Sequence, residues 1–160
     1  MAAYVTAFIG LGSNLGDREK NLRDAYELLG KLPQTNGLRL SSLIETKPVD
    51  SPAGSPDFMN AVAKIETKLP PRDLLKALLG IEKQLGRDRS GVRNEPRTLD
   101  LDLLLYGDKV VNEPDLVVPH PRMHQREFVL WPLLQIDSRV RDPRTGDPFA
   151  DAYQKLKGHP

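Results

Sequence analysis

Two aspartates one residue apart, Asp100 and Asp102, are the residues of this sequence best suited to chemistry. They lie in the segment TLDLDLLLY, which otherwise has the pattern of a buried strand. Because successive side chains of a strand point to opposite faces, both carboxylates share one face and lie about 6.5–7 Å apart along it. Two carboxylates this close repel each other and resist burial unless a cation lies between them. The pair therefore predicts a metal site.

The alternative is that the two aspartates form the solvated face of an amphipathic edge strand. Leucines, however, occupy both parities of this segment, at Leu99, Leu101, Leu103 and Leu104. Both faces of the strand are therefore expected to be partly buried, which favours a metal pair over a solvated face.

The loop that precedes the pair is rich in arginine. Its charged residues are Arg87, Asp88, Arg89, Arg93, Glu95 and Arg97. Hard oxygen ligands beside guanidinium groups are the chemical complement of a polyphosphate with its magnesium ions. Four arginines together with Gly91 and Pro96 are more typical of a closing lid than of a packed connection, although an exposed loop with local ion pairs is the alternative.

Size and composition limit the functional classes. With 160 residues the chain fits one domain, and with no cysteine it has neither disulfides nor thiolate sites. The net charge of +1 gives no broad basic field for nucleic acid. We find neither a signal-peptide pattern nor an apolar run long enough to span a membrane, so a cytoplasmic protein is the expectation.

Apolar periodicity and turn residues predict the order β-α-β-β-α-β. The expected strands are 4–11, 38–45, 58–66 and 98–106, and the expected helices are 18–29 and 70–86. This order is the ferredoxin-like βαββαβ pattern, an α+β sandwich with two helices on one face of an antiparallel sheet. The C-terminal part adds short strands at 109–111 and 117–121, an amphipathic piece at 128–136 broken at Pro132, and a helix at 149–156. We expect a single domain, 1–160, with mobile lid loops near 46–57 and 87–97.

Two motifs have more common interpretations that this sequence does not support. GLGSNLG, with Gly10, Gly12 and Gly16, lacks the spacing of a dinucleotide fingerprint, and Gly12 is better explained by close approach of a ligand or backbone. His120 and His124 have the spacing of a zinc pair but no Glu follows His120, and a proline separates them. His120 is expected to donate a hydrogen bond, either to backbone or to a ligand phosphate.

Several ordered blocks resemble the 6-hydroxymethyl-7,8-dihydropterin pyrophosphokinase family over nearly the whole chain. They are GSNLG from Gly12, Thr46-x-Pro48, FMNAV from Phe58, Ile81-Glu82 with Gly86-Arg87, PRTLDLD from Pro96, VPHPRM from Val118, and FVLWPL from Phe128. The resemblance implies a ferredoxin-like fold and transfer of pyrophosphate from ATP to the hydroxymethyl group of the reduced pterin, with release of AMP. It also implies a monomer acting on small molecules.

The resemblance also implies roles for individual residues. Asp100 and Asp102 would hold two Mg²⁺ ions, and Arg87 and Arg97 would reach the phosphates from the lid as catalytic residues. The ATP site would further include Glu82, His120 and Arg126. Glu82 would thereby explain the charge on an otherwise apolar helix stripe. The pterin site would consist of Gly12, Thr46, Val49, Phe58, Asn60 and Phe128, with the two phenylalanines stacking on the ring and Asn60 reading its polar edge.

The lid is where the sequence departs from that family. An aromatic residue followed by glycine is common shortly before the Pro-Arg of the lid, whereas this chain has Asn94 and Glu95. The altered lid leaves open a pterin- and nucleotide-binding relative with weakened catalysis. A second alternative, which comes from the fold rather than the lid, is a ferredoxin-like binding module for RNA. The second would need exposed aromatics and a basic sheet face, but the expected central strands present two carboxylates.

Overall fold

The computed structural model describes residues 3–14, 16–46, 57–86 and 99–158. Its framework is a five-stranded antiparallel sheet with the order β2-β4-β1-β5, in which β3 pairs with the other end of β4. The strands are β1 (Val5–Ser13), β2 (Thr35–Leu40), β3 (Ile44–Thr46), β4 (Phe58–Thr67) and β5 (Asp100–Tyr106). This is the strand order of a ferredoxin-like fold, so the predicted fold class is confirmed.

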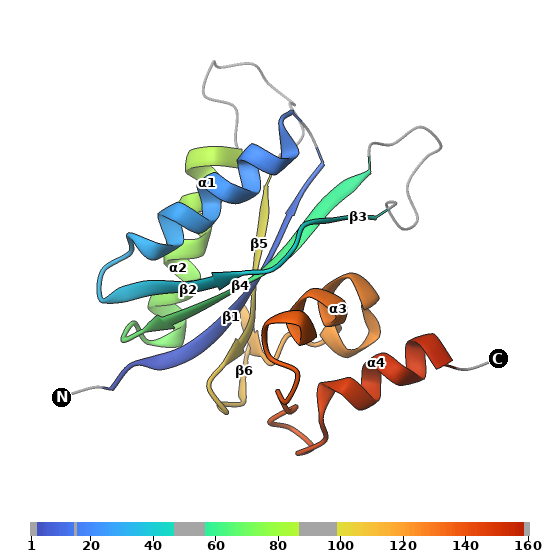
Figure 1. Ribbon diagram of the computed structural model, residues 1–160. Helices are drawn as coiled ribbons and strands as arrows, with labels where there is room; N and C mark the ends of the chain where they lie inside the picture. The colour runs from blue at the N-terminus through green and yellow to red at the C-terminus, as the bar shows by residue number, and fades with distance from the viewer. Residues whose placement is uncertain (1–2, 15, 47–56, 87–98, 159–160) are drawn as a thin grey trace.

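Helices cover both faces of the sheet (Figure 1). One hydrophobic cluster joins alternate residues of β1, such as Ala7 and Ile9, to α1 (Arg18–Gly30) and α2 (Pro71–Ile81). A second cluster joins the opposite face, beginning at Phe8, to α3 (Glu127–Ile136) and α4 (Phe149–Gly158). Neighbouring residues of a strand point to opposite faces, and in β1 both sets are apolar. The sheet is therefore buried on both sides.

The helix boundaries follow from local chemistry. At the start of α1, the Asp17 side chain accepts a hydrogen bond from the Lys20 backbone N–H (3.1 Å), as expected of an N-cap. Pro71 is the first residue of α2, where its missing N–H removes no helical bond. α2 then continues into a π-helical turn, η1 (Glu82–Gly86), so the predicted helix 70–86 is two consecutive pieces.

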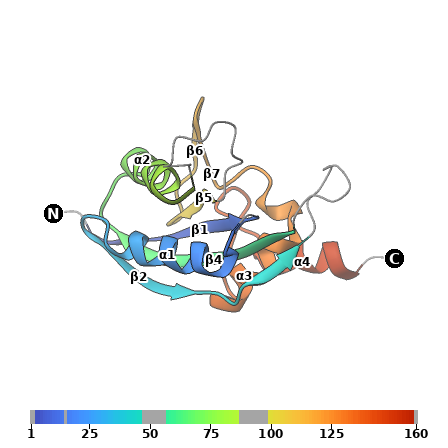
Figure 2. The same ribbon diagram turned by 90° about the horizontal axis from the view of Figure 1, so that it is seen from above.

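The hairpin that follows β5 extends from the main sheet (Figure 2). It consists of β6 (Val111–Glu113) and β7 (Leu116–Val118), and it leads to a short 3-10 turn, η2 (Met123–Gln125). Arg72 of α2 forms ion pairs with Glu113 and with Asp115, at 2.9 Å in the second case, which ties the hairpin to that helix.

Two sequence expectations were wrong in detail. The strand expected at 38–45 is interrupted, because the Ser41 hydroxyl accepts from the Val62 N–H (2.9 Å) and the Ser42 N–H donates to Gln135 on α3 (2.8 Å). The chain is therefore diverted between β2 and β3. The expected break at Pro132 is absent: α3 runs through that residue, which is buried together with Leu130 and Leu133, while Trp131 is exposed. Among the described residues, no helix has the length and apolar character that a membrane span requires.

Candidate functional site

Gly12 is at the centre of a row of paired residues that crosses four strands. Its register partners are Asn60 on β4 and Asp100 on β5, and Ile44 on β3 pairs with Asn60 in turn. The next row of the same face places Gly10 beside Asp102. Because residues two apart along a strand share a face, all these positions face α3 rather than α1 and α2.

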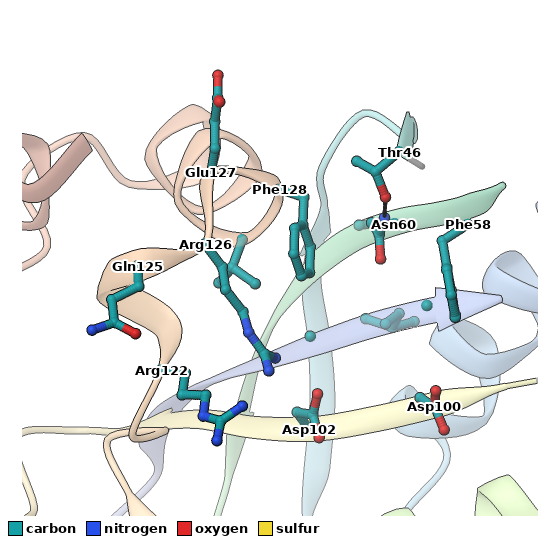
Figure 3. A pocket seen from close by; sticks show the side chains of 15 residues that line it. Thr46, Phe58, Asn60, Asp100, Asp102, Arg122, Gln125, Arg126, Glu127 and Phe128 are labelled. Atoms are coloured by element: carbon teal, nitrogen blue, oxygen red, sulfur yellow. Dashed lines mark hydrogen bonds between the residues drawn. The ribbon is translucent and has the colours of Figure 1, made fainter. Parts of the chain in front are cut away.

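The two glycines form the floor of a pocket of about 650 Å³ between this face and the start of α3 (Figure 3). With no side chains at Gly10 and Gly12, a ligand can approach the β1 backbone closely. The remaining walls come from β3, β4, β5, the segment before α3 and the first turn of α3. They include Thr46, Phe58, Asn60, Asp100, Asp102, Arg122, Gln125, Arg126 and Phe128. The register thus brings together residues that are far apart in the sequence.

The two carboxylates lie side by side on β5 and point into this pocket (Figure 3). Asp102 is exposed at the open side of the pocket, but nearby protein atoms remove part of its hydration, and this desolvation raises its pKa above the ordinary value. The charge of Asp100 raises the pKa of Asp102 further, whereas His120 and Arg126 oppose the shift. Both carboxylates therefore share one face of β5, as strand alternation predicts, and the metal assignment stays a prediction.

These two oxygen ligands fit a magnesium ion that is completed by a substrate. In the described part of the chain, no group of three or more His, Cys, Asp or Glu side chains could hold a metal alone. Mg²⁺ typically uses one or two carboxylates together with substrate phosphates and water, rather than a cage built only of protein groups. Asp100 and Asp102 supply that number of ligands on one open face.

Cations stand opposite the carboxylates. Figure 3 shows the Arg126 side chain extending from the start of α3 toward Asp102, beside the ring of Phe128. The guanidinium carbon of Arg126 lies 5.7 Å from the centroid of that ring, which is within cation–π range. Arg122 enters the same space. The pocket therefore offers positive charge at one wall and a carboxylate pair at the other, as binding of a metal-complexed polyphosphate requires.

His120 is partly buried near the carboxylates. Its backbone N–H donates to the Leu104 carbonyl (2.9 Å), and its Nδ1 accepts from the Arg122 N–H (3.2 Å). Burial lowers the pKa of His120, and the charge of Asp102 partly restores it. In the neutral ring, Nε2 then carries the proton, because Nδ1 acts as acceptor. The sequence left two uses open for this histidine, a hydrogen bond to backbone or one to a ligand phosphate. Nδ1 accepts from backbone instead of donating to it, so a donated hydrogen bond would come from the Nε2–H.

The polar and aromatic residues of the β4 wall are also in place. The Asn60 amide nitrogen donates to the Thr46 hydroxyl (2.6 Å), and the Asn60 side chain is buried. Phe58 and Phe128 stand on either side of this pair, one on β4 and the other on α3 (Figure 3). A planar ligand can thus enter between two aromatic rings and meet a fixed amide at its edge.

Glu82 is not among the residues that line the pocket. It is buried, and its Oε2 accepts a hydrogen bond from the Leu101 backbone N–H (2.7 Å), behind the carboxylate pair. Three other expected site residues, Val49, Arg87 and Arg97, lie outside the described residues, as do Asn94 and Glu95 and most of the two expected lid loops. Their roles stay predictions.

Sequence reasoning missed part of the pocket. Gly10, Arg122, Gln125 and Glu127 line it without having been assigned a role. Gly10 could have been predicted, because Gly10 and Gly12 are two residues apart and share one face of the strand. Two residues without side chains leave that face open to a ligand. No local signal singled out Gln125 or Glu127, since their place depends on how α3 packs against the sheet.

The electrostatics of Asp102 give a stability prediction. A folded-state pKa above the ordinary 3.8 means that the charged form is disfavoured by folding. Asp102→Asn should therefore raise the melting temperature of the metal-free protein at neutral pH. The gain should shrink as the pH falls through the raised pKa and vanish below the ordinary value, where the wild-type carboxyl is protonated in both states. Thermal unfolding between pH 3 and pH 8 measures this, and an equal or lower melting temperature at neutral pH would contradict it.

Comparison with known proteins gives a consistent result. The family described as 7,8-dihydro-6-hydroxymethylpterin-pyrophosphokinase (HPPK) matches residues 8–138. The 2-amino-4-hydroxy-6-hydroxymethyldihydropteridine pyrophosphokinase of Haemophilus influenzae is 46% identical over 141 residues, which cover 88% of this chain and 87% of that protein. The folic acid synthesis protein fol1 of Pneumocystis carinii is 43% identical over 155 residues, but the match spans only 20% of its length.

A solved structure of wild-type HPPK-DHPS from Plasmodium falciparum, titled as a complex with pteroate, has the same fold. The TM-score is 0.73 at 13% sequence identity, and the match covers 97% of this chain and 43% of that one. This chain therefore spans less than half of that protein and most of the Haemophilus relative. From the family match over most of its length and the identity to relatives of similar size, the chain belongs to the HPPK family.

Proposed function

We propose that this protein transfers pyrophosphate from ATP to the 6-hydroxymethyl group of 7,8-dihydropterin and releases AMP. The observation that carries the proposal is the row Asn60–Gly12–Asp100. Adjacent strands are about 4.8 Å apart, so the amide on β4 and the carboxylate on β5 stand about 9–10 Å from each other across a floor without side chains. A bicyclic pterin lying over Gly12 would present its edge to Asn60 and its hydroxymethyl arm to the carboxylates.

The pterin would be held by stacking and by its polar edge. Phe58 and Phe128 supply the two aromatic faces, and each stack contributes about 1–3 kcal/mol. Thr46 fixes the Asn60 amide through the 2.6 Å hydrogen bond, so the amide meets the heterocycle in one orientation. Selectivity follows because a ligand without matching donors and acceptors leaves buried polar groups unpaired.

The triphosphate would lie along the carboxylates and the cations. Asp100 and Asp102 would hold two Mg²⁺ ions, which when bound neutralise phosphate charge and favour attack by the hydroxymethyl oxygen. Arg126 and the His120 Nε2–H would donate to phosphate oxygens, with Arg87 and Arg97 approaching from the expected lid. Phosphoryl transfer requires in-line positioning and charge neutralisation more than a strong base, so no residue has to remove the hydroxyl proton before attack.

The decisive experiment identifies the products. Incubation with ATP, Mg²⁺ and 6-hydroxymethyl-7,8-dihydropterin should yield AMP and the pterin diphosphate in equal amounts. ³¹P NMR identifies and quantifies both products. Omission of the pterin controls for hydrolysis and should leave ATP intact. ADP as the main product would overturn the proposal. Binding of the pterin and ATP without AMP formation would instead identify a catalytically weakened relative.

The same proposal includes the setting in which the protein works. We infer a monomer, because the pocket is formed by residues of one chain and needs no partner to close the described walls. The absence of cysteine fits a reducing compartment, and we infer the cytoplasm. Light scattering coupled to size-exclusion chromatography should give a mass near 17.9 kDa, and a stable dimer would contradict the first of these inferences.

Gly12→Ala tests the floor of the pterin site. A methyl group at Gly12 would lie 3.1 Å from the Asn60 Oδ1 and 3.8 Å from a ring carbon of Phe58, so it would displace the amide that reads the pterin. We expect the KM for the pterin to rise about tenfold, equivalent to about 1.4 kcal/mol, with a smaller change for ATP. Steady-state kinetics measures both.

The matched control is Gly80→Ala on α2. A methyl group there meets nothing within 4 Å, and alanine favours the helix. This variant should keep both KM values and be slightly more stable. A Gly12→Ala enzyme with an unchanged pterin KM would show that the pterin does not lie over this residue.

A further inference from the structure

The Leu101 N–H has an unusual partner for a strand residue. β5 pairs with β1 alone among the described strands of the main sheet, so its other side is an edge. In an antiparallel ladder, N–H groups alternate between facing the partner strand and facing away. Because the Leu101 N–H donates to the Glu82 carboxylate (2.7 Å), it faces away from β1, and the N–H groups of Asp100 and Asp102 face toward β1.

Glu82 itself is held firmly. Its relative exposure is only 6%. It directly follows Ile81, and it lies one helical turn after Leu78; both are buried residues of α2. A buried carboxylate is costly unless its oxygens accept hydrogen bonds, and a bond from a backbone N–H to an ionised group is among the stronger ones. It opens the π-helical turn η1, a type of irregularity that occurs often at functional sites. The helix end thus delivers a fixed acceptor to the edge of β5.

We propose that Glu82 is a positioning residue, which holds the Asp100–Leu101–Asp102 segment in the geometry that metal binding needs. The inference rests on the proposed function, since it takes these two aspartates as the magnesium ligands. β1 holds the segment from one side at both aspartates, and Glu82 holds it from the other side at the residue between them. The segment is thereby fixed at three successive residues, although its two carboxylates repel each other.

The size of the effect follows from the demands of the metal. Mg²⁺ requires near-ideal octahedral geometry, so a small shift of either carboxylate weakens binding. Removal of groups that orient metal ligands from outside the coordination shell typically lowers metal affinity about 10–100-fold. Glu82 touches the ligand strand through its backbone, so it should act in the same way without contacting the metal.

Two variants separate this role from the alternatives. Glu82→Gln keeps an oxygen acceptor for the Leu101 N–H and removes the charge, whereas Glu82→Met keeps the side-chain length and removes the acceptor. A residue that acts by its charge on the nucleotide would fail in both variants. A positioning residue would fail only in the second.

The first readout is the metal-free protein. Amide hydrogen exchange followed by NMR should be slow at Leu101 in the wild type and in Glu82→Gln, and at least about tenfold faster in Glu82→Met, where this N–H has lost its acceptor. The second readout is Mn²⁺ affinity, measured by EPR with a non-hydrolysable ATP analogue present. Glu82→Met should weaken it about tenfold or more, and Glu82→Gln less than about threefold.

Ile81→Ala is the control for packing. Ile81 is buried beside Glu82, so its truncation lowers the melting temperature while leaving the bond to Leu101 in place. It should keep the wild-type Mn²⁺ affinity. Unchanged affinity in Glu82→Met, equal losses in Glu82→Met and Glu82→Gln, or an equal loss in Ile81→Ala would each overturn the proposal. If Glu82→Met does not fold, Glu82→Gln decides. Slow exchange at Leu101 with Mn²⁺ affinity near the wild type supports the positioning role, and loss of either overturns it.

Asp102→Asn, titrated in the same series, tests the metal site separately. If this variant binds Mn²⁺ as tightly as the wild type, the assignment of the metal ligands fails, whatever the Glu82 variants show. If Asp102→Asn loses binding and Glu82→Met does not, only the positioning role fails.

Discussion

Asp100→Asn and Asp102→Asn are each expected to lower the rate of AMP formation by on the order of 10³-fold, the loss of several kcal/mol of transition-state stabilisation. Both carboxylates face the pocket from one side of β5, and the chain offers no third ligand among its described residues. Asparagine has nearly the same shape but no charge, so the change removes the attraction for Mg²⁺ while preserving the strand. Measurement of kcat at saturating ATP, pterin and Mg²⁺ tests this.

Asp108→Asn is the matched control, because Asp108 is an exposed acid in the turn just after β5, away from the pocket. It should keep wild-type turnover. The predicted rise in melting temperature for Asp102→Asn makes the test sharper, since an inactive variant that is more stable than the wild type has not lost activity through unfolding. Turnover within about tenfold of the wild type in both asparagine variants would mean that neither carboxylate holds the metal.

The parity of β-strands made much of the site predictable. Phe58 and Asn60 share one face of β4, and Asp100 and Asp102 share one face of β5, as alternation requires. Alternation alone does not predict the register between strands, which places Asn60 and Asp100 on either side of Gly12. That register depends on which strands become neighbours, a property of the whole sheet.

The β2–β3 region shows the same limit for the fold. Apolar residues recur along the segment 38–45, at Leu38, Leu40, Leu43 and Ile44, so one continuous strand was the expectation. Ser41 instead forms a hydrogen bond with Val62 of β4. Ser42 forms one with Gln135 of α3, which is 93 residues away in the sequence. No local pattern contains such a long-range partner. Beyond the interruption, β3 pairs with β4, and the Thr46 hydroxyl accepts from the Asn60 amide (2.6 Å).

Glu82 illustrates a third case. Its charge on an apolar helix stripe was visible as an anomaly in the sequence, and the resemblance placed it in the nucleotide site. Its contact with the Leu101 N–H came only from the packing of η1 against the edge of β5. A local irregularity therefore indicated a residue with a function, while the atom that it contacts depended on the tertiary structure.

Phe128→Ala is expected to raise the KM for the pterin by about 5- to 150-fold, because one stacked face is worth about 1–3 kcal/mol. Arg126 also rests on this ring, at 5.7 Å from its centroid, so the KM for ATP should rise as well. A partly exposed cation–π contact contributes only about 0.5–1 kcal/mol, which limits that second effect to about fivefold. The ratio of the two changes, measured by steady-state kinetics with each substrate varied in turn, therefore reports on what the ring does.

Trp131→Ala on the same helix is the control, since Trp131 is 38% exposed and lines a neighbouring cavity rather than the proposed pterin pocket. Its loss removes a comparable aromatic surface from α3 without touching the pterin, so both KM values should stay near the wild type. A larger rise for ATP than for the pterin in Phe128→Ala would mean that the ring mainly positions Arg126. In that case the flat substrate would have to stack on Phe58 alone, and the proposed pose across Gly12 would be wrong.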